Sequence, residues 1–345
     1  SPAIRMPPVT PGCTSSALPF SRCRSARSFS CVKERGSTRS VCPAGGGGGG
    51  EADDARGLNV QPGSDPDRQF AHRQGARLRI VSSGDGITVS TQELLDAIDV
   101  RTKLVAVSHV LFKSGYIQDI RAIVEKAHAC GALVILDAYH SVGIMPVDVR
   151  ELGVDVLVGG VLKWLCGGPG AAFLWTSPSV RKKLQPAITG WLAHTRPFAF
   201  ETSMKYSKDA RKFLNGTPSI SALAAAQVGP RIIQRAGIRN IRSKSKRQTD
   251  FLIGEAERRG FEIRSPRDPE QRGGTVTIHV PHAYEVSREL LRRNIIVDYR
   301  RGAGIRLGPH FYNSDEELLS AIESIEQILR TKAYRKHAGR SSTVT

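Results

Sequence analysis

The feature that most constrains the fold of this chain is a short apolar run, residues 132–136, that ends directly in Asp137. Five consecutive apolar residues fit a strand that is buried on both faces, as in a parallel sheet. In open α/β sheets the ligand crevice lies outside the carboxyl ends of the strands, so Asp137 is expected to face that crevice. The run therefore predicts an α/β fold with a binding site at this edge of the sheet.

A lysine in an unusual setting, Lys163, follows Asp137 after 163 − 137 = 26 residues, with a glycine pair on either side of it. Its immediate neighbours are apolar, which disfavours the ammonium form and makes a nucleophilic neutral amine available near neutral pH. Pyridoxal phosphate chemistry requires such an amine to hold the aldehyde as an imine, and an aspartate to keep the pyridine nitrogen protonated. The alternative is that Asp137 caps a helix and Lys163 extends its ammonium group into solvent.

The pattern around these two residues alternates between strands and helices, as in βαβ units. We expect strands at 77–81, 103–109, 132–137, 155–158 and 171–175, and helices at 91–98, 119–129 and 219–228. A long helix at 231–259 precedes shorter strands at 275–280, 295–298 and 305–307 and helices at 283–293 and 315–329. The predicted organisation is a large domain (69–229), a connecting helix (230–259) and a small α+β domain (260–332), with disordered ends (1–68 and 333–345).

The chain is strongly basic, because 50 Lys and Arg against 32 Asp and Glu give a net charge of +18. The basic residues are spread along the sequence, aromatic residues make up only 6%, and no nucleic-acid-binding motif occurs. Solvated helix faces and an anionic cofactor or substrate therefore explain the charge better than nucleic acid does. No apolar stretch reaches the length of a membrane span, so we expect neither nucleic acid nor a membrane as a partner.

The cysteines and the N-terminal segment bear on the compartment. Six cysteines in 345 residues do not make a disulfide framework, and four of them lie before residue 43 without metal-ligand spacing, so no metal site is expected. A reducing compartment, the cytoplasm, fits best. The first acidic residue is Glu34, and the Ser- and Arg-rich start faintly resembles an organelle transit peptide, which is the alternative. A misread or fused reading frame explains this start equally well.

Further motifs recur along residues 69–330. They lie at 108–115, 136–143, 163–170, 190–200, 213–218 and 305–309, and they include Gly-Trp-Leu-Ala-His and Gly-Thr-Pro. In this order they resemble fold-type I pyridoxal phosphate enzymes of aminotransferase class V, and among these kynureninase. The resemblance implies a three-layer α/β/α large domain with a smaller C-terminal α+β domain, and pyridoxal 5'-phosphate as the cofactor.

The resemblance also implies a role for each matching residue. Lys163 would hold the cofactor and move the proton at Cα, Asp137 would pair with the pyridine nitrogen, and His140 would lie beside the ring. Arg306 would bind the substrate α-carboxylate, for which a planar guanidinium is well suited. Trp191 and Thr217 would reach the cofactor phosphate of a neighbouring subunit, which implies a homodimer with shared active sites. From the residues alone, Trp191 could equally be a core residue and Thr217 a helix cap, and Arg306 could instead form an internal ion pair.

Two departures from kynureninase qualify this prediction. Leu162 stands where kynureninases usually carry a tyrosine that bonds the phosphate and transfers a proton. The family's early region, with the aromatic residue that stacks on the pyridine ring and a phosphate-binding turn, should precede residues 69–75, but a Gly-, Ser- and Arg-rich segment stands there. Both departures put cofactor binding and the hydrolytic reaction in question.

Three functions remain open from the sequence. The first is kynureninase-like hydrolysis of the Cβ–Cγ bond of L-kynurenine or a related amino acid, giving an aromatic acid and alanine. The second is transamination or another class V conversion of an amino acid, which Leu162 favours. The third is a truncated, catalytically impaired homologue that acts only as a binding or structural subunit. A cysteine desulfurase is not expected, because no cysteine follows Cys166.

Overall fold

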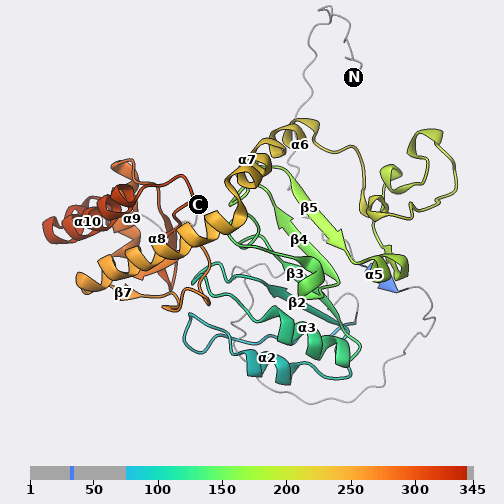
Figure 1. Ribbon diagram of the computed structural model, residues 1–345, viewed down its shortest axis with the longest axis horizontal. Helices are drawn as coiled ribbons and strands as arrows, with labels where there is room; N and C mark the ends of the chain where they lie inside the picture. Colours follow the sequence, from blue (N-terminus) through green and yellow to red (C-terminus); the bar gives the residue numbers. More distant parts are fainter. Residues whose placement is uncertain (1–31, 35–74, 340–345) are drawn as a thin grey trace, which may run out of the picture.

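A computed structural model describes residues 32–34 and 75–339 of the chain. Its central feature is a four-stranded sheet in the order β2-β3-β4-β5 (Figure 1). The strands are β2 (Leu104–Ser108), β3 (Leu133–Asp137), β4 (Val156–Gly160) and β5 (Ala172–Thr176). The first three are parallel and β5 runs antiparallel to β4. The α/β fold and the strands expected in this part from 103 onward are thereby confirmed.

Alternate residues of β3 pack on opposite faces of this sheet, as the period of a strand requires. Val134 and Leu136 are fully buried against one side, in a core that includes Ile123. On the other side Ile135 packs with Val180 of α5 (Pro178–Lys183). Helices thus cover both faces, which gives the three layers that the family resemblance implies.

Capping residues mark the starts of the helices beside the core that contains Val134 and Leu136. Helix α2 (Thr91–Ala97) begins after Ser90, whose hydroxyl accepts a hydrogen bond from the Glu93 amide. Helix α3 (Ile120–Ala129) begins after Asp119, and the short α4 (Val149–Leu152) begins after Asp148, both capped in the same way. Gly131 has a φ of 75° and turns the chain out of α3 into β3.

The register of the parallel strands sets the position of the site. Ser108 lies opposite Asp137, and Asp137 lies opposite Val158, so the carboxyl ends of β2, β3 and β4 meet at one edge. The segments that leave these three strands therefore start side by side, although they are far apart in the sequence.

A second sheet forms the C-terminal part, with antiparallel strands in the order β7-β8-β10-β9. Its strands are β7 (Glu262–Ile263), β8 (Val276–His279), β9 (Asp298–Arg300) and β10 (Gly304–Leu307). Helices α9 (Ala283–Arg292) and α10 (Asp315–Thr331) pack on it around a core of fully buried side chains, among them Ile278, Leu290 and Ile322. This small α+β unit agrees with the prediction.

Five expectations differ from the structure. Residues 77–81 pair with no strand in the described part of the chain, so this expected strand is wrong. The strand expected at 295–298 is β9, shifted to Asp298–Arg300, where it finds its partner β10. The long helix is two helices, α7 (Val228–Ala236) and α8 (Ile238–Arg258), because Gly237 has a φ of 82° between them. Figure 1 shows α8 crossing from the large sheet to the small unit.

The expected disordered tail is the fourth difference. Residues Ala333–His337 form a 3₁₀ helix, η4, after α10. His337 is buried, and its Nε2 lies 3.0 Å from a carboxylate oxygen of Glu289 in α9. This contact and the packing of η4 on the small unit order the chain beyond residue 332. A fifth difference is strand β1 (Val32–Glu34), which lies within the segment expected to be disordered (1–68) and pairs with a later strand. The predictions for residues 1–31, 35–74 and 340–345 lie outside the described residues.

The segment between β5 and α7 carries several of the exposed apolar side chains of the described chain, among them Phe198, Phe200 and Ile220. It contains α5, strand β6 (Leu184–Pro186), which pairs with β1 (Val32–Glu34), the 3₁₀ helices η1 (Trp191–Ala193), η2 (Pro197–Ala199) and η3 (Ala210–Phe213), and α6 (Ile220–Ala226). Helix α6 has no buried residue. In Figure 1 the 3₁₀ region extends to the side of the sheet opposite the small unit.

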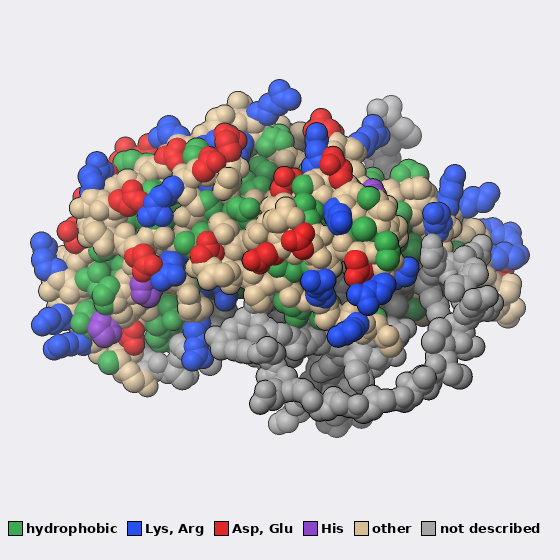
Figure 2. All heavy atoms as spheres, turned by 90° about the horizontal axis from the view of Figure 1, so that it is seen from below, with side chains coloured by type: hydrophobic (Ala, Val, Ile, Leu, Met, Phe, Trp, Pro, Cys, Tyr) green, Lys and Arg blue, Asp and Glu red, His purple; other side chains and the backbone are tan. Residues whose placement is uncertain are grey.

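Two surface properties complete the description. On the face drawn in Figure 2, Lys and Arg side chains are interspersed with Asp and Glu over most of the surface. This mixture accords with the expectation that the net charge is distributed rather than gathered in one basic patch. Among the described helices, none combines the length and the apolar character that crossing a membrane would need.

Candidate active site

The site is built outward from Asp137, the last residue of β3. Its Oδ1 accepts a hydrogen bond of 2.8 Å from the backbone amide of Tyr139, which fixes the carboxylate in the turn after the strand. Burial raises the pKa of Asp137, whereas this amide and the charge of Lys163 act in the opposite direction. The aspartate is therefore a half-buried group whose charge depends on a neighbouring cation.

Lys163 reaches the same place from the loop after β4. This loop packs closely on the turn at Gly143, where a Cβ would lie 2.6 Å from the carbonyl carbon of Trp164. Burial lowers the pKa of Lys163 from 10.5 to about 8; the charge of Arg306 adds to this effect and that of Asp137 opposes it. A neutral, nucleophilic amine is thus accessible near neutral pH, as the sequence predicts.

His140 is the direct partner of this amine. The Nζ of Lys163 lies 2.5 Å from Nε2 of His140. Burial and the charges of Lys163 and Arg306 lower the pKa of His140 to about 3, so the imidazole is neutral at ordinary pH and Nε2 can accept the hydrogen bond from the ammonium group. The pair positions the amine and offers a place for its proton.

Tyr139, which the sequence analysis did not single out, forms the floor beneath the amine. The Nζ of Lys163 lies 4.6 Å from the centre of the Tyr139 ring. The ring fits because Gly160 of β4 has no side chain: a Cβ there would lie 2.1 Å from the Tyr139 hydroxyl oxygen. Gly160, the second glycine of the pair before Lys163, is therefore needed to make room for the Tyr139 ring.

Arg306 enters the site from the small unit. In the antiparallel register of β10 and β9 it lies opposite Asp298, and its guanidinium bonds the Asp298 carboxylate. It also bonds the carbonyl of Phe112, 194 residues earlier, in the segment that follows β2. Four of the six predicted residues, Asp137, His140, Lys163 and Arg306, therefore come together from separate parts of the chain.

Trp191 and Thr217 lie elsewhere. The Trp191 ring packs on Phe198 and Phe200 at centroid distances of 5.3 and 6.2 Å, and Thr217 is exposed. A hydrogen bond of 3.2 Å from the Leu192 amide to the Asn215 carbonyl holds their two segments side by side. Within the described residues neither side chain bonds any member of the Lys163 cluster. Their predicted role across a subunit boundary stays a prediction, as do the individual roles of the other four residues.

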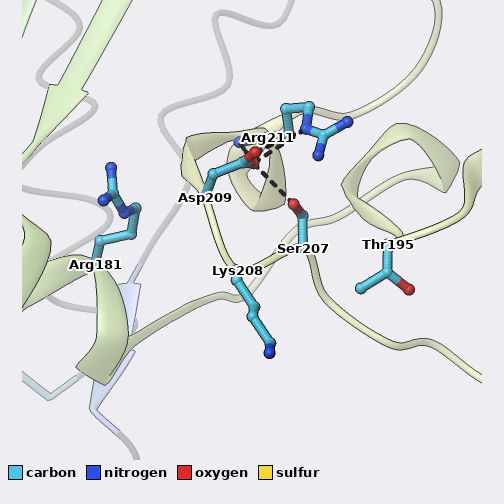
Figure 3. Close-up of a pocket in the computed structure, with 6 residues that line it drawn as sticks. All are labelled: Arg181, Thr195, Ser207, Lys208, Asp209 and Arg211. Carbon is cyan, nitrogen blue, oxygen red and sulfur yellow. Dashed lines mark hydrogen bonds and ion pairs between the residues drawn. The ribbon is translucent and has the colours of Figure 1, made fainter.

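Two surface hollows lie apart from this cluster. One, of about 350 Å³, is lined by Arg181, Thr195, Ser207, Lys208, Asp209 and Arg211 (Figure 3). In that figure the Arg181 guanidinium and the Lys208 amine point away from each other, while Arg211 is bound to Asp209. The other hollow, of about 560 Å³, lies on the small unit around Tyr284, Tyr299 and Gly302. Neither is lined by a predicted site residue.

The donor set fits the reactive parts of pyridoxal phosphate. Burial lowers the pKa of the Lys163 amine, which favours the neutral form that reacts with an aldehyde. The Oδ2 of Asp137 makes no hydrogen bond within the described residues, so it can accept one from a pyridine N–H. Leu162, whose side chain is 46% exposed, supplies no polar group here. The residues that would hold the aldehyde and the ring nitrogen are therefore Lys163 and Asp137.

Comparison with known proteins agrees with this site. The sequence profile of the aminotransferase class-V family matches residues 64–313. Kynureninase of Pseudomonas fluorescens is 34% identical over 268 residues, covering 76% of this chain and 63% of that protein. Kynureninase of Burkholderia mallei is 31% identical over 249 residues, covering 70% and 60%. The chain thus spans less than two thirds of the length of these relatives.

Solved structures share the fold at lower identity. A cysteine desulfurase from Thermococcus onnurineus NA1 superposes with a TM-score of 0.70 at 23% identity, covering 77% of this chain and 69% of that one. An alanine–glyoxylate aminotransferase from Nostoc sp. gives 0.61 at 22% identity, covering 76% and 71%. A C-DES variant with glycine covalently linked to its PLP cofactor gives 0.68 at 19% identity, covering 75% and 70%. With the matching profile and the clustered Lys163 and Asp137, these findings establish that the chain belongs to the aminotransferase class-V family and has the fold of type I pyridoxal phosphate enzymes.

Proposed function

We propose that this protein is a pyridoxal phosphate-dependent enzyme acting on an amino acid, with kynureninase-like hydrolysis of L-kynurenine or a related γ-oxo amino acid as its reaction. The cofactor is pyridoxal 5'-phosphate. The observation that carries the proposal is the hydrogen bond between the desolvated amine of Lys163 and a neutral His140, with Asp137 beside them. The two kynureninase relatives favour hydrolysis over other class V reactions.

The chain's own residues have separate tasks in this reaction. Lys163 holds the cofactor and then exchanges a proton at the substrate Cα, which its pKa of about 8 permits in both directions near neutral pH. His140 orients the amine, and Asp137 holds the proton on the ring nitrogen. Arg306 binds the α-carboxylate through its planar fork. When bound, the cofactor supplies the electron sink for bonds broken at the substrate.

A class V aminotransferase is the second candidate. The exposed Leu162 favours it, because this side chain offers no hydroxyl to a hydrolytic step. Incubating the purified protein with pyridoxal phosphate and L-kynurenine separates the two: anthranilate and alanine support hydrolysis, whereas an oxo acid supports transamination.

Lys163→Ala tests whether the chain uses the cofactor at all. Wild-type protein is expected to develop an absorbance band from cofactor linked to lysine, at a rate that rises with pH through about 8 as the amine is deprotonated. The variant is expected to show no such band, and exposed Lys126→Ala serves as the matched control. A wild-type protein without the band would instead indicate a catalytically impaired homologue.

We also propose that the active unit is a homodimer. The support is a group of exposed apolar side chains between residues 188 and 232, of which Phe198 and Phe200 are 75% and 76% exposed and Ile220 is 67% exposed. The Phe198 and Phe200 rings pack on Trp191, and exposed apolar side chains in mutual contact are typical of surfaces that another protein covers. Trp191 and Thr217 belong to the same region, which accords with their predicted role in a neighbouring subunit's site.

A further inference from the structure

The small unit contributes a second arginine to the site. Asp298 and Arg300 are alternate residues of β9, and Arg306 lies opposite Asp298 on β10, so all three side chains leave the same face of the sheet. Tyr299 and Ile305, between them, belong to the core on the other face. The strand period therefore delivers two guanidinium groups and one carboxylate to the side that faces Lys163.

Arg300 lies within electrostatic reach of the reacting groups. Its charge, like that of Arg306, lowers the pKa of Lys163 and of His140. Its guanidinium carbon lies 5.4 Å from the centre of the Phe112 ring, and that ring lies 6.4 Å from the His140 ring. Arg300, Phe112 and His140 thus form one continuous wall of the site.

The hydrogen bonds of this group are incomplete. Arg300 and Arg306 both bind the same oxygen, Oδ2, of Asp298, at 2.9 Å in the case of Arg300. One carboxylate therefore balances two guanidinium charges, which leaves one positive charge without a partner. The Nε of Arg300 is also buried without a hydrogen-bond partner among the described residues. A buried donor in this state is costly unless a ligand atom satisfies it.

We infer that Arg300 is a specificity-determining residue that binds an oxygen acceptor, a carboxylate or a carbonyl, on the side chain of the amino-acid substrate. Arg306 binds the α-carboxylate. Together the two arginines therefore select a substrate whose α-carboxylate and side-chain acceptor are separated by a matching distance. This inference rests on the proposed function and narrows its substrate class. Amino acids with a purely hydrocarbon side chain would leave Arg300 unsatisfied, and the site would discriminate against them.

Inert carboxylates test this inference without any turnover. The full chain loaded with pyridoxal phosphate is titrated calorimetrically with succinate, with 4-oxopentanoate and with pentanoate, which lacks a second acceptor. Because a charge-assisted hydrogen bond is gained, the first two are expected to bind about tenfold more tightly than pentanoate. The comparison of succinate with 4-oxopentanoate shows whether an acid or a ketone is preferred.

Three variants separate recognition from structure. In Arg300→Gln the preference for the two-acceptor ligands is expected to fall below about twofold while the affinity for pentanoate is retained, since Arg306 remains. Arg306→Gln is expected to weaken all three ligands. Arg301→Gln, at the exposed neighbouring position, is the matched control and is expected to bind like wild type. If Arg300→Gln does not fold, Arg300→Lys keeps the charge and is expected to retain part of the preference for succinate and to lose that for the ketone.

The inference is overturned if wild type binds the three ligands equally, or if Arg300→Gln, or Arg300→Lys in its place, retains the full preference for both two-acceptor ligands. Its failure is distinguishable from failure of the proposed function, because the binding measurement does not depend on which product is formed. Anthranilate release without any preference would remove only the role of Arg300. A preference for the two-acceptor ligands without anthranilate release would support the role of Arg300 and indicate a reaction other than hydrolysis of L-kynurenine.

Discussion

Two clusters of buried ionisable groups in this protein differ in how many hydrogen-bond partners those groups have. In the small unit, the carboxylate of Glu289 is fully buried and bound by Arg292, Arg293 and His337. Around Lys163, by contrast, the amine, Asp137 and His140 have few partners, and burial is the main cause of each pKa shift. The fully bonded Glu289 carboxylate stabilises the fold, whereas the groups around Lys163, which have fewer partners, are available to a ligand.

Glu289→Gln should have the largest effect on stability. Hydrogen bonds from Arg292 and His337 hold the pKa of Glu289 well below its usual range, and neutralising it leaves the partner cations without a charge to bind. Because both arginines are partly exposed, we expect a loss of about 2 kcal/mol in the free energy of unfolding, measured by urea titration. The exposed Glu323→Gln is the control, and an equal loss in both variants would contradict the comparison.

The same cluster predicts a pH dependence. A carboxylate whose folded-state pKa is depressed contributes stability that is present above the unfolded pKa and is lost as the pH falls through the folded value. Wild type should therefore lose its advantage over Glu289→Gln progressively below about pH 4.5, the ordinary value for this group. A constant difference between the two proteins from pH 7 to pH 3 would rule out this source of stability.

Lys163→Met should raise the stability of the protein, whereas Glu289→Gln lowers it. Removing a desolvated amine relieves the cost of its charge, so we expect the variant without cofactor to be more stable by about 1 kcal/mol at pH 7, allowing for partial exposure. Because folding lowers the pKa of Lys163 from 10.5 to about 8, the unfolded chain binds more protons between these values. The free energy of unfolding of wild type should therefore rise between pH 8 and pH 10.5, and its difference from that of Lys163→Met should disappear.

Urea titrations of both proteins at several pH values measure this difference. The exposed Lys126→Met is the control for the loss of a lysine, and it should show no such pH dependence in this range. If Lys163→Met is less stable than wild type, the amine has a structural role and the contrast between the two clusters disappears.

Arg292→Gln should have the smallest effect and sharpens the contrast within the first cluster. Its side chain is 57% exposed, and Glu289 retains Arg293 and His337 when it is removed. We therefore expect a clearly smaller loss than in Glu289→Gln, compared in the same urea titrations. A loss as large as that of Glu289→Gln would mean that the carboxylate depends on this one partner.

Local sequence patterns predicted most elements of the fold but not all of them. The caps Ser90 and Asp119 mark the starts of α2 and α3, because a side-chain oxygen that satisfies free backbone amides is a local signal. Residues 77–81 carry a strand-like composition but lack a partner strand in the described structure. Pairing is a property of two segments, so composition alone could not decide it.

The sequence by itself determined the buried strand that ends in Asp137, the unusual setting of Lys163 and the family to which both belong. Only the tertiary structure decided that Arg300 shares the site. The signal was present as the alternation of Asp298 and Arg300, but which face of β9 meets Lys163 depends on how the small unit docks. The bond from Arg306 to the Phe112 carbonyl joins residues 194 positions apart, and a contact so distant in the chain leaves no local pattern to read.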